Sequence, residues 1–226
     1  MGGLMSCIQK FLPLLILSFL STPVFAVDEE LLKSSLTDII AIKDHCHNQG
    51  SGFHYHDPLT VISVNHVTIS KECGELKTLV IGFLTEGRRD IGVKRAIAAK
   101  DGPILIDKVV LDMSYEGEQK FLSKMASVVH RGEKVYVPVY DFLNGDKSVQ
   151  PAKITAFVKR IRVGDDFGIH TYRNLLTVSP TTGEGSSGSP VVNENNEIVG
   201  VIVAGNKKVS YAFPVEGLEF KEPRKD

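Results

Sequence analysis

The apolar positions of this chain follow a helical period first and a strand period afterwards. Residues 28–43 (DEELLKSSLTDIIAIK) place leucines and isoleucines at helical spacing, with Asp28 as a candidate N-cap. From about residue 48 onward, short runs rich in β-branched and aromatic residues follow one another, and Gly, Asp, Asn or Pro lies in most of the gaps. This pattern predicts one N-terminal helix followed by many short strands.

The predicted strands fall into two groups of similar size. Short strands without intervening helices indicate an antiparallel sandwich or barrel. Residues 116–128 (EGEQKFLSKMASV) interrupt them with a helical pattern that places Phe121, Leu122 and Met125 on one side. We therefore expect two small β subdomains joined by a linker. The predicted strands lie at 60–64, 76–83, 91–98, 104–111, 135–140, 154–163, 171–178, 190–192, 198–203 and 209–213.

The first 26 residues have the pattern of a secretory signal rather than of a folded segment. Lys10 is their only charge, the apolar run 11–20 is too short to span a bilayer, and Val24-Phe25-Ala26 is a small-x-small cleavage pattern. We expect cleavage after Ala26, export to the periplasm or the medium, and no stable membrane anchor afterwards. The alternatives are an uncut anchor, or myristoylation at the N-terminal MGGLMS with palmitoylation of Cys7.

Composition narrows the possible partners. The chain has 226 residues, with 42% hydrophobic and 23% charged residues, which is ordinary for a globular protein. The formal net charge of −1 gives no reason to expect nucleic acid or an anionic membrane surface as a partner.

The expected signal cleavage removes Cys7 and leaves Cys46 and Cys73. In an exported protein such a pair is a disulfide candidate, and the alternative is two separate buried thiols.

One glycine-rich segment, residues 183–190 (GEGSSGSP), has the composition of a nucleophile turn. A serine hydroxyl attacks a carbonyl only with a neighbouring base, an orienting carboxylate and backbone N–H groups aimed at the oxyanion. Glycines suit such a turn because they adopt unusual φ values and carry no Cβ that would block the substrate. Here Ser187 is flanked so that its own N–H and that of Gly185 can converge on one point. Glycine-rich surface loops are also common.

The segment Gly185–Pro190 resembles the Gly-x-Ser-Gly-x-Pro motif of chymotrypsin-like serine peptidases, and further segments are similar to their bacterial HtrA-like branch. The segment Gly50–Phe53 (GSGF), followed by 61–67 (VISVNHV), resembles the strand and histidine segment of that branch. The similarity continues in 89–93 (RDIGV), 191–201 and 211–214 (YAFP). It departs from the usual pattern at Ser189 and in the Val-Asn before His66. No PDZ-like module follows, which favours a stand-alone peptidase domain.

The resemblance implies an all-β fold of two antiparallel six-stranded barrels of chymotrypsin type with a short N-terminal helix. We expect a signal peptide at 1–26, an N-terminal helix or propeptide at 27–47, the first barrel at 48–115, a linker at 116–131 and the second barrel at 132–226. It also implies a disulfide from Cys46 to Cys73 that brackets the catalytic histidine. Such a loop closure contributes roughly 3 kcal/mol.

The implied activity is that of an exported serine endopeptidase which cleaves protein or peptide substrates through an acyl-enzyme and needs no cofactor. The resemblance assigns His66 as base, Asp90 as its orienting acid and Ser187 as nucleophile, with the amides of Gly185 and Ser187 as oxyanion hole. Rivals of Asp90 are Asp101, Asp107 and Asp112. The floor of the specificity pocket is Thr181, which favours a small or apolar residue before the cut, and Ala204 and Gly205 are candidates for the edge that pairs with substrate backbone.

Two other classes of function compete with the peptidase. The first is a catalytically silent relative that binds peptides or proteins, and the complete triad argues against it. The second is a histidine-rich metal-binding β protein. His54 and His56 are two residues apart, on one face of a strand, and could join His45, Cys46 or His47 around a metal. Because this spacing matches no fixed zinc pattern, we predict no metal, and we assign no role to His130 and His170.

Overall fold

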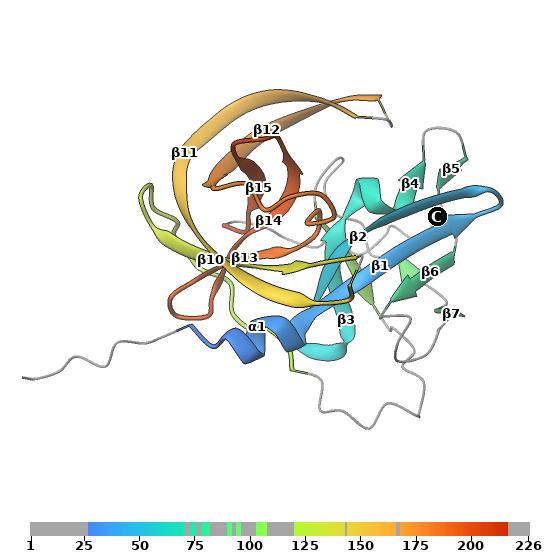
Figure 1. The fold of residues 1–226 in the computed structure, drawn as a ribbon, viewed down its shortest axis with the longest axis horizontal. Helices are drawn as coiled ribbons and strands as arrows, with labels where there is room; N and C mark the ends of the chain where they lie inside the picture. Colours follow the sequence, from blue (N-terminus) through green and yellow to red (C-terminus); the bar gives the residue numbers. More distant parts are fainter. Residues whose placement is uncertain are drawn as a thin grey trace, which may run out of the picture.

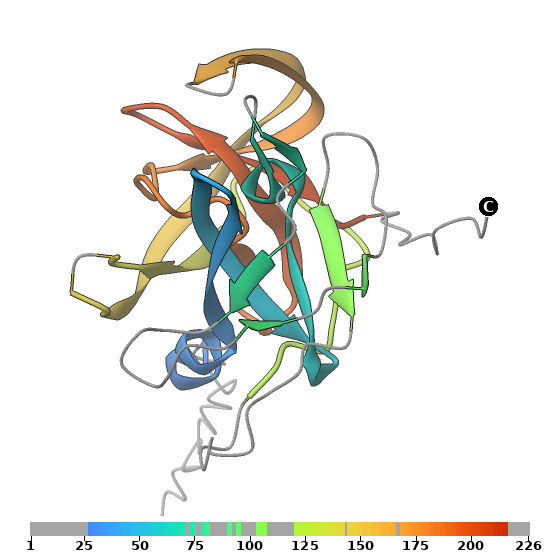
Figure 2. The same cartoon turned by 90° about the vertical axis from the view of Figure 1, so that its right-hand side faces the viewer.

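The structure of the protein is a computed structural model (Figures 1 and 2). The predicted signal peptide, residues 1–26, lies outside the residues that it describes. Within the described part of the chain, no helix combines the length and the apolar character needed to cross a membrane. The described residues are 27–70, 73–75, 78–81, 90–91, 94–95, 103–107, 120–142, 144–165 and 168–216.

The N-terminal segment is half helix and half strand. Helix α1 (Glu29–Ser35) begins after Asp28, whose Oδ1 accepts a hydrogen bond from the Leu31 N–H at 2.9 Å, so the predicted N-cap is confirmed. The helix predicted over 28–43 is wrong beyond Ser35, because β1 (Leu36–Lys43) pairs along its full length with β2 (Cys46–Tyr55). A sheet ladder on both sides of β1 outweighs its weak helical periodicity.

The first half of the protein is a seven-stranded sheet of antiparallel pairs in the order β7-β6-β1-β2-β3-β9-β8. Because β1 is one of its inner strands, the sheet begins before residue 48. The six-stranded first barrel that we predicted is not confirmed in this form. The remaining elements of this half are β3 (Asp57–Val64), the 3-10 turn η1 (Asn65–Thr68), β4 (Ile69–Ser70), β5 (Gly74–Glu75), β6 (Thr78–Ile81), β7 (Asp90–Ile91), β8 (Lys94–Arg95) and β9 (Pro103–Asp107).

The second half is a closed barrel of six strands in the order β10-β11-β12-β15-β14-β13, as predicted. Its valines and isoleucines alternate into a buried interior that includes Val137, Ile154 and Val199. Strands β11 and β12 continue past the barrel and arch over it (Figure 1). The strands are β10 (Lys134–Tyr140), β11 (Lys147–Asp165), β12 (Gly168–Ser179), β13 (Pro190–Asn193), β14 (Ile198–Gly205) and β15 (Ser210–Pro214).

The extended segment 120–128 forms backbone hydrogen bonds with both halves of the protein. The helix predicted over 116–128 is wrong for its described residues 120–128, which contain no helix. The Leu122 N–H donates to the His54 carbonyl of β2 at 3.0 Å, and the Ala126 N–H donates to the Ile198 carbonyl of β14 at 2.8 Å. These backbone groups therefore have tertiary partners in place of helical ones. Leu122 is 1% exposed in a core cluster that also holds Phe53 and Val201, one from each half.

Candidate active site

In the turn of residues 183–188, Ser187 is partly exposed and its neighbour Ser186 is buried. Gly183, Gly185 and Gly188 have φ values of +84°, +80° and +95°, which side chains with a Cβ rarely adopt. Ser186 is 4% exposed, and its Oγ donates to the Gly183 carbonyl at 2.8 Å. Ser189, just after the turn, is also buried, whereas Ser187 is half-buried. Of the three serines, Ser187 is thus the one most open to a reagent.

The Ser187 turn lies directly against strand β2. The Ser51 N–H donates to the Ser187 carbonyl at 2.7 Å. A Cβ on Gly188 would lie 1.8 Å from the Ser51 carbonyl oxygen, so only glycine permits this approach. Backbone contact across the two halves therefore fixes how far the turn stands from the first sheet.

His66 lies beside the same part of β2. It belongs to η1, directly after β3, and its carbonyl accepts a hydrogen bond from Asn48 Nδ2 at 3.1 Å. A Cβ on Gly50 would lie 2.5 Å from Cγ2 of Val67 and 3.0 Å from the Ser187 carbonyl oxygen. The residue that follows His66 and the carbonyl of Ser187 thus both pack next to Gly50.

The backbone of Asp90 lies on β7, at one end of the sheet order. Asp90 begins β7 and pairs with Val80 of β6, which in turn pairs with Ile40 of β1. Two strands therefore separate β7 from β2 in the sheet order. The side chain of Asp90 lies outside the described residues, as do Asp101, Asp112 and the side chain of Asp107.

The predicted specificity residues lie together on the far side of the turn. A Cβ on Gly205 would lie 3.6 Å from Oγ1 of Thr181, and that oxygen is 3.4 Å from Oγ of Ser210. Ala204 and Gly205 pair with β15 on one side. On the other side, β14 pairs with β13 as far as Val201, and Ile202 exchanges backbone hydrogen bonds with Gly188 and Ser189.

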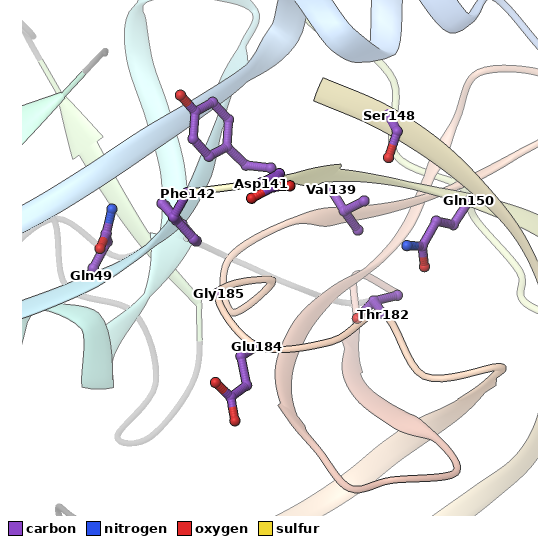
Figure 3. Close-up of a pocket in the computed structure, with 10 residues that line it drawn as sticks. Gln49, Val139, Asp141, Phe142, Ser148, Gln150, Thr182, Glu184 and Gly185 are labelled. Carbon is purple, nitrogen blue, oxygen red and sulfur yellow. The ribbon is translucent and has the colours of Figure 1, made fainter. Parts of the chain in front are cut away.

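A pocket of about 650 Å³ opens beside Gly185 (Figure 3). Its walls come from β2, from the β10–β11 hairpin and from the 182–185 segment. Two of its walls carry carboxylates, Asp141 and Glu184. The lining residues are Gln49, Val139, Tyr140, Asp141, Phe142, Ser148, Gln150, Thr182, Glu184 and Gly185.

A buried carboxyl group that the sequence pattern did not single out lies on β1, beside β2. Asp38 of β1 is 2% exposed and faces Ser51 in the β1–β2 register, so the two side chains share one face of the sheet. Neither carboxylate oxygen makes a hydrogen bond of good geometry to a described residue. Burial raises the pKa of Asp38 from 3.8 to about 6, and nearby Gln49 and Lys147 offset this only in part.

Asp38→Asn is expected to change how stability depends on pH. Because the folded state holds the Asp38 proton more tightly, this carboxyl contributes stability that is fully present below pH 3.8 and is lost as pH rises through about 6. About two pKa units correspond to about 3 kcal/mol. Relative to the wild type, the free energy of unfolding of Asp38→Asn measured in urea should rise by about 2.4 kcal/mol between pH 4 and pH 7.5, since part of the effect has already been lost at pH 4.

The matched control for this measurement is Asp44→Asn. Asp44 is exposed in the neighbouring β1–β2 turn, with a φ of +53° that asparagine tolerates. Asp44→Asn makes the same chemical change at an exposed position, so the Asp38→Asn result is read relative to it. An Asp38→Asn difference that does not change between the two pH values would contradict a raised pKa.

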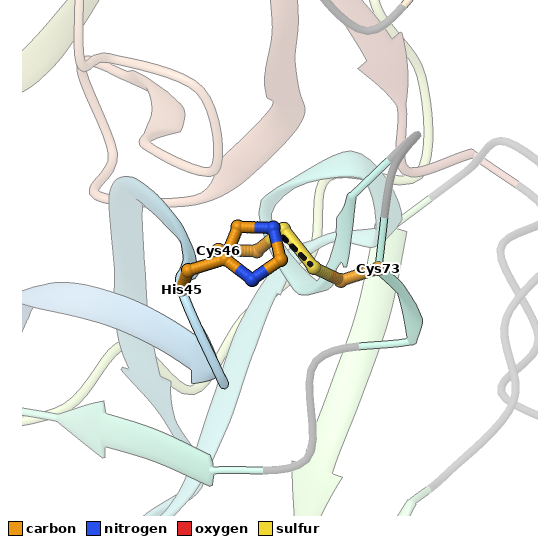
Figure 4. Close-up of a disulfide and its surroundings, with 3 residues drawn as sticks. All are labelled: His45, Cys46 and Cys73. Atoms are coloured by element: carbon orange, nitrogen blue, oxygen red, sulfur yellow. Dashed lines mark hydrogen bonds between the residues drawn. A yellow bond between two sulfur atoms is a disulfide. The ribbon is translucent and has the colours of Figure 1, made fainter.

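The predicted disulfide between Cys46 and Cys73 is present (Figure 4). It ties the start of β2 to the turn before β5 and encloses His66, and a closure of 27 residues contributes about 3 to 4 kcal/mol. Cys46, Cys73 and His45 also form the one group of three metal-ligating side chains found among the described residues. Because the two sulfurs are bonded to each other, this group offers no thiolate to a metal.

The metal constellation considered around His54 and His56 is not assembled. Neither belongs to the group of three found within the described ranges. The expectation that they share one face is wrong as well, because the strand ends between them. His54 is 1% exposed, while His56 is exposed and has a φ of +64°.

Comparisons with known proteins agree with this architecture. A sequence model described as "Trypsin-like peptidase domain" matches residues 50–201. The active form of the Rv3671c protease from M. tuberculosis is 18% identical, with coverage of 86% of this chain and 85% of that chain and a TM-score of 0.60. The HtrA-type protease AlgW with tripeptide is 15% identical, with coverage of 84% and 59% and a TM-score of 0.59. Deg5 is 13% identical, with coverage of 83% and 87% and a TM-score of 0.59.

Proposed function

The chain belongs to the trypsin-like peptidase family and is a serine endopeptidase, and from this premise we propose that Ser187 is its nucleophile and His66 its general base. In this mechanism His66 takes the Ser187 proton as the hydroxyl attacks the scissile carbonyl, and later gives it to the leaving amine. The amides of Gly185 and Ser187 stabilise the tetrahedral oxyanion. A water molecule then hydrolyses the acyl-enzyme.

One observation carries this proposal: the histidine segment and the serine turn meet at Gly50. Val67, which follows His66, and the carbonyl of Ser187 would both crowd a Cβ at that position. His66 and Ser187 come from opposite halves of the protein and are 121 positions apart in the chain. A general base has to lie within hydrogen-bond reach of its nucleophile, which requires such convergence.

The register of the strands bears on which aspartate orients His66. Strand β9 begins with Pro103, two residues after Asp101, and pairs Pro103 with Val64, two residues before His66. Asp101 itself lies outside the described residues. Asp90 begins β7, whose described pairing is with β6 and not with β3. The register therefore supports Asp101 more than Asp90 as the third member of the triad, and we propose that both be tested.

We also propose that the first sheet closes into a six-stranded barrel. Strands β7 and β8 are at opposite edges of the sheet order, yet only residues 92–93 separate them in the chain. Ile91 and Lys94 can be at most about 11 Å apart, whereas a flat sheet would hold its edge strands about 29 Å apart. Closure makes β7 and β8 two parts of one strand and reduces the seven strands to six.

The substrate is proposed to be a protein or peptide bound as an added strand along Val203–Gly205. Beyond Ile202 this part of β14 pairs with β15 alone among the described residues, which leaves its other edge for substrate backbone. Thr181 next to Gly205 is uncharged, and this supports a small or apolar residue before the cut.

We further propose export after cleavage at Ala26, and the disulfide supports this because such bonds persist in oxidising compartments.

A fluorophosphonate probe tests the proposed nucleophile. Purified residues 27–226 are expected to be labelled at Ser187, and mass spectrometry of the labelled peptide should distinguish it from the buried Ser186 and Ser189. Unfolded protein and the Ser187→Ala variant should remain unlabelled, because reaction requires an activated hydroxyl. Folded, disulfide-bonded protein that takes no label at Ser187 would overturn the proposal and leave a silent, peptide-binding relative.

A further inference from the structure

One residue of β2 holds both parts of the backbone proposed to form the oxyanion hole. The Ser51 N–H donates to the Ser187 carbonyl at 2.7 Å, and the Ser51 hydroxyl donates to the Gly185 carbonyl at 2.9 Å. Ser51 is 0% exposed. We propose that Ser51 is a positioning residue whose hydroxyl orients the Gly185 amide toward the oxyanion; this inference rests on the proposed function.

The geometry of Gly185 explains why an anchor is needed. Glycine populates positive and negative φ about equally, so an unsupported Gly185 would sample conformations in which its N–H points elsewhere. The N–H and the C=O of one residue are joined through a single Cα. Two rotatable bonds, φ and ψ, separate them, so a carbonyl fixed by the Ser51 hydroxyl removes part of this freedom and restricts the amide to fewer orientations around the observed φ of +80°.

The opposite side of Gly185 is held by an aromatic ring. A Cβ on Gly185 would lie 1.9 Å from Cε2 of Phe142, so the ring packs directly on the glycine Cα. Phe142 and Gly185 both line the pocket beside the turn (Figure 3). Gly185 is thus clamped between the Phe142 ring, which only excludes space, and the Ser51 hydroxyl, which fixes a direction.

Ser51 is itself rigidly placed. Its carbonyl accepts a hydrogen bond from the Ser63 hydroxyl of β3 at 2.7 Å, and Gly188 packs against the same carbonyl. Its backbone pairs with Asp38 of β1. A hydroxyl carried by an inner strand of the sheet moves little, and catalytic donors are effective when they are preorganised in this way.

Rates of fluorophosphonate labelling test the role of the hydroxyl. Ser51→Ala is expected to lower the maximal labelling rate constant about ten- to hundredfold, because the phosphonyl transition state uses the same oxyanion donors. The half-saturating probe concentration should stay within about threefold, since the ground-state probe makes little use of those donors.

The matched control is Ser35→Ala. Ser35 is also 0% exposed, and its hydroxyl likewise donates to a backbone carbonyl, that of Leu32 at 3.0 Å, within helix α1. It should lose similar thermal stability and keep its labelling rate within about twofold. Ser51→Thr retains the hydroxyl and is expected to restore at least about a third of the wild-type rate. All rates are compared where circular dichroism shows the variants folded.

The outcomes separate the inference from the proposed function. Wild type labelled at Ser187 together with an equally fast Ser51→Ala variant would overturn the positioning role and leave the nucleophile intact. A folded Ser51→Thr as slow as Ser51→Ala would also overturn it, because the hydroxyl would then not matter. Wild type without label at Ser187 would overturn both.

Discussion

Ser187→Ala and His66→Ala are each expected to lower the rate of p-nitrophenol release from p-nitrophenyl acetate by roughly 10⁴- to 10⁶-fold. Without the hydroxyl there is no nucleophile, and without the imidazole the hydroxyl keeps its proton at neutral pH. Because the two groups act as one unit, the double variant should be no slower than the slower single variant. Absorbance of the released p-nitrophenol at neutral pH, corrected for hydrolysis in buffer, measures all three.

Stability is the control for this comparison. His66 is half-buried in η1 and Ser187 is half-buried in its turn. The free energy of unfolding of each alanine variant should therefore lie within about 1 kcal/mol of that of the wild type. A double variant that multiplied the two single effects would contradict a coupled serine and histidine. A His66→Ala variant with unchanged rate would remove His66 from the mechanism.

Asp101→Asn is expected to lower the same rate about 10⁴-fold at neutral pH, whereas Asp90→Asn should change it by less than about tenfold. Asparagine next to the base stabilises the wrong imidazole tautomer and offers no charge to the imidazolium. The pairing of Pro103 with Val64 is the basis for choosing Asp101.

The two asparagine variants serve as controls for each other, because both make the same chemical change in the same half of the protein. The opposite pattern, a large loss in Asp90→Asn alone, would restore the assignment that the Asp-Ile-x-Val similarity suggested. Small effects in both would mean that neither aspartate orients His66.

Strand positions in the second half were predictable from the sequence because hydrophobic alternation and turn residues agree there. The runs at 135–140 and 198–203 correspond to β10 and β14 within a few residues. The disulfide was predictable too, since the expected cleavage after Ala26 would leave a single pair of cysteines. Local chemistry was thus sufficient wherever the local pattern and the tertiary environment favour the same structure.

The two predicted helices failed for the opposite reason. Leu36–Lys43 and the segment around Leu122 carry apolar residues at helical spacing, but each finds its hydrogen-bond partners on a strand of another part of the chain. Helix propensity differences of a few tenths of a kcal/mol per residue are small beside such ladders and the burial that accompanies them. Periodicity alone contains no information about those partners.

The sequence by itself determined the family, the serine and histidine motifs, and the alternation that builds the barrel, because each depends on residues close together in the chain. Only the tertiary structure decided that β1 is an inner strand, that Asp38 is buried opposite Ser51, and that Ser51 holds the Gly185 carbonyl. Asp38 and Ser51 are more than ten positions apart in the chain, and Ser51 and Gly185 are more than a hundred apart. They arise from the register of strands and the docking of the two halves, which are set by the packing of the whole chain.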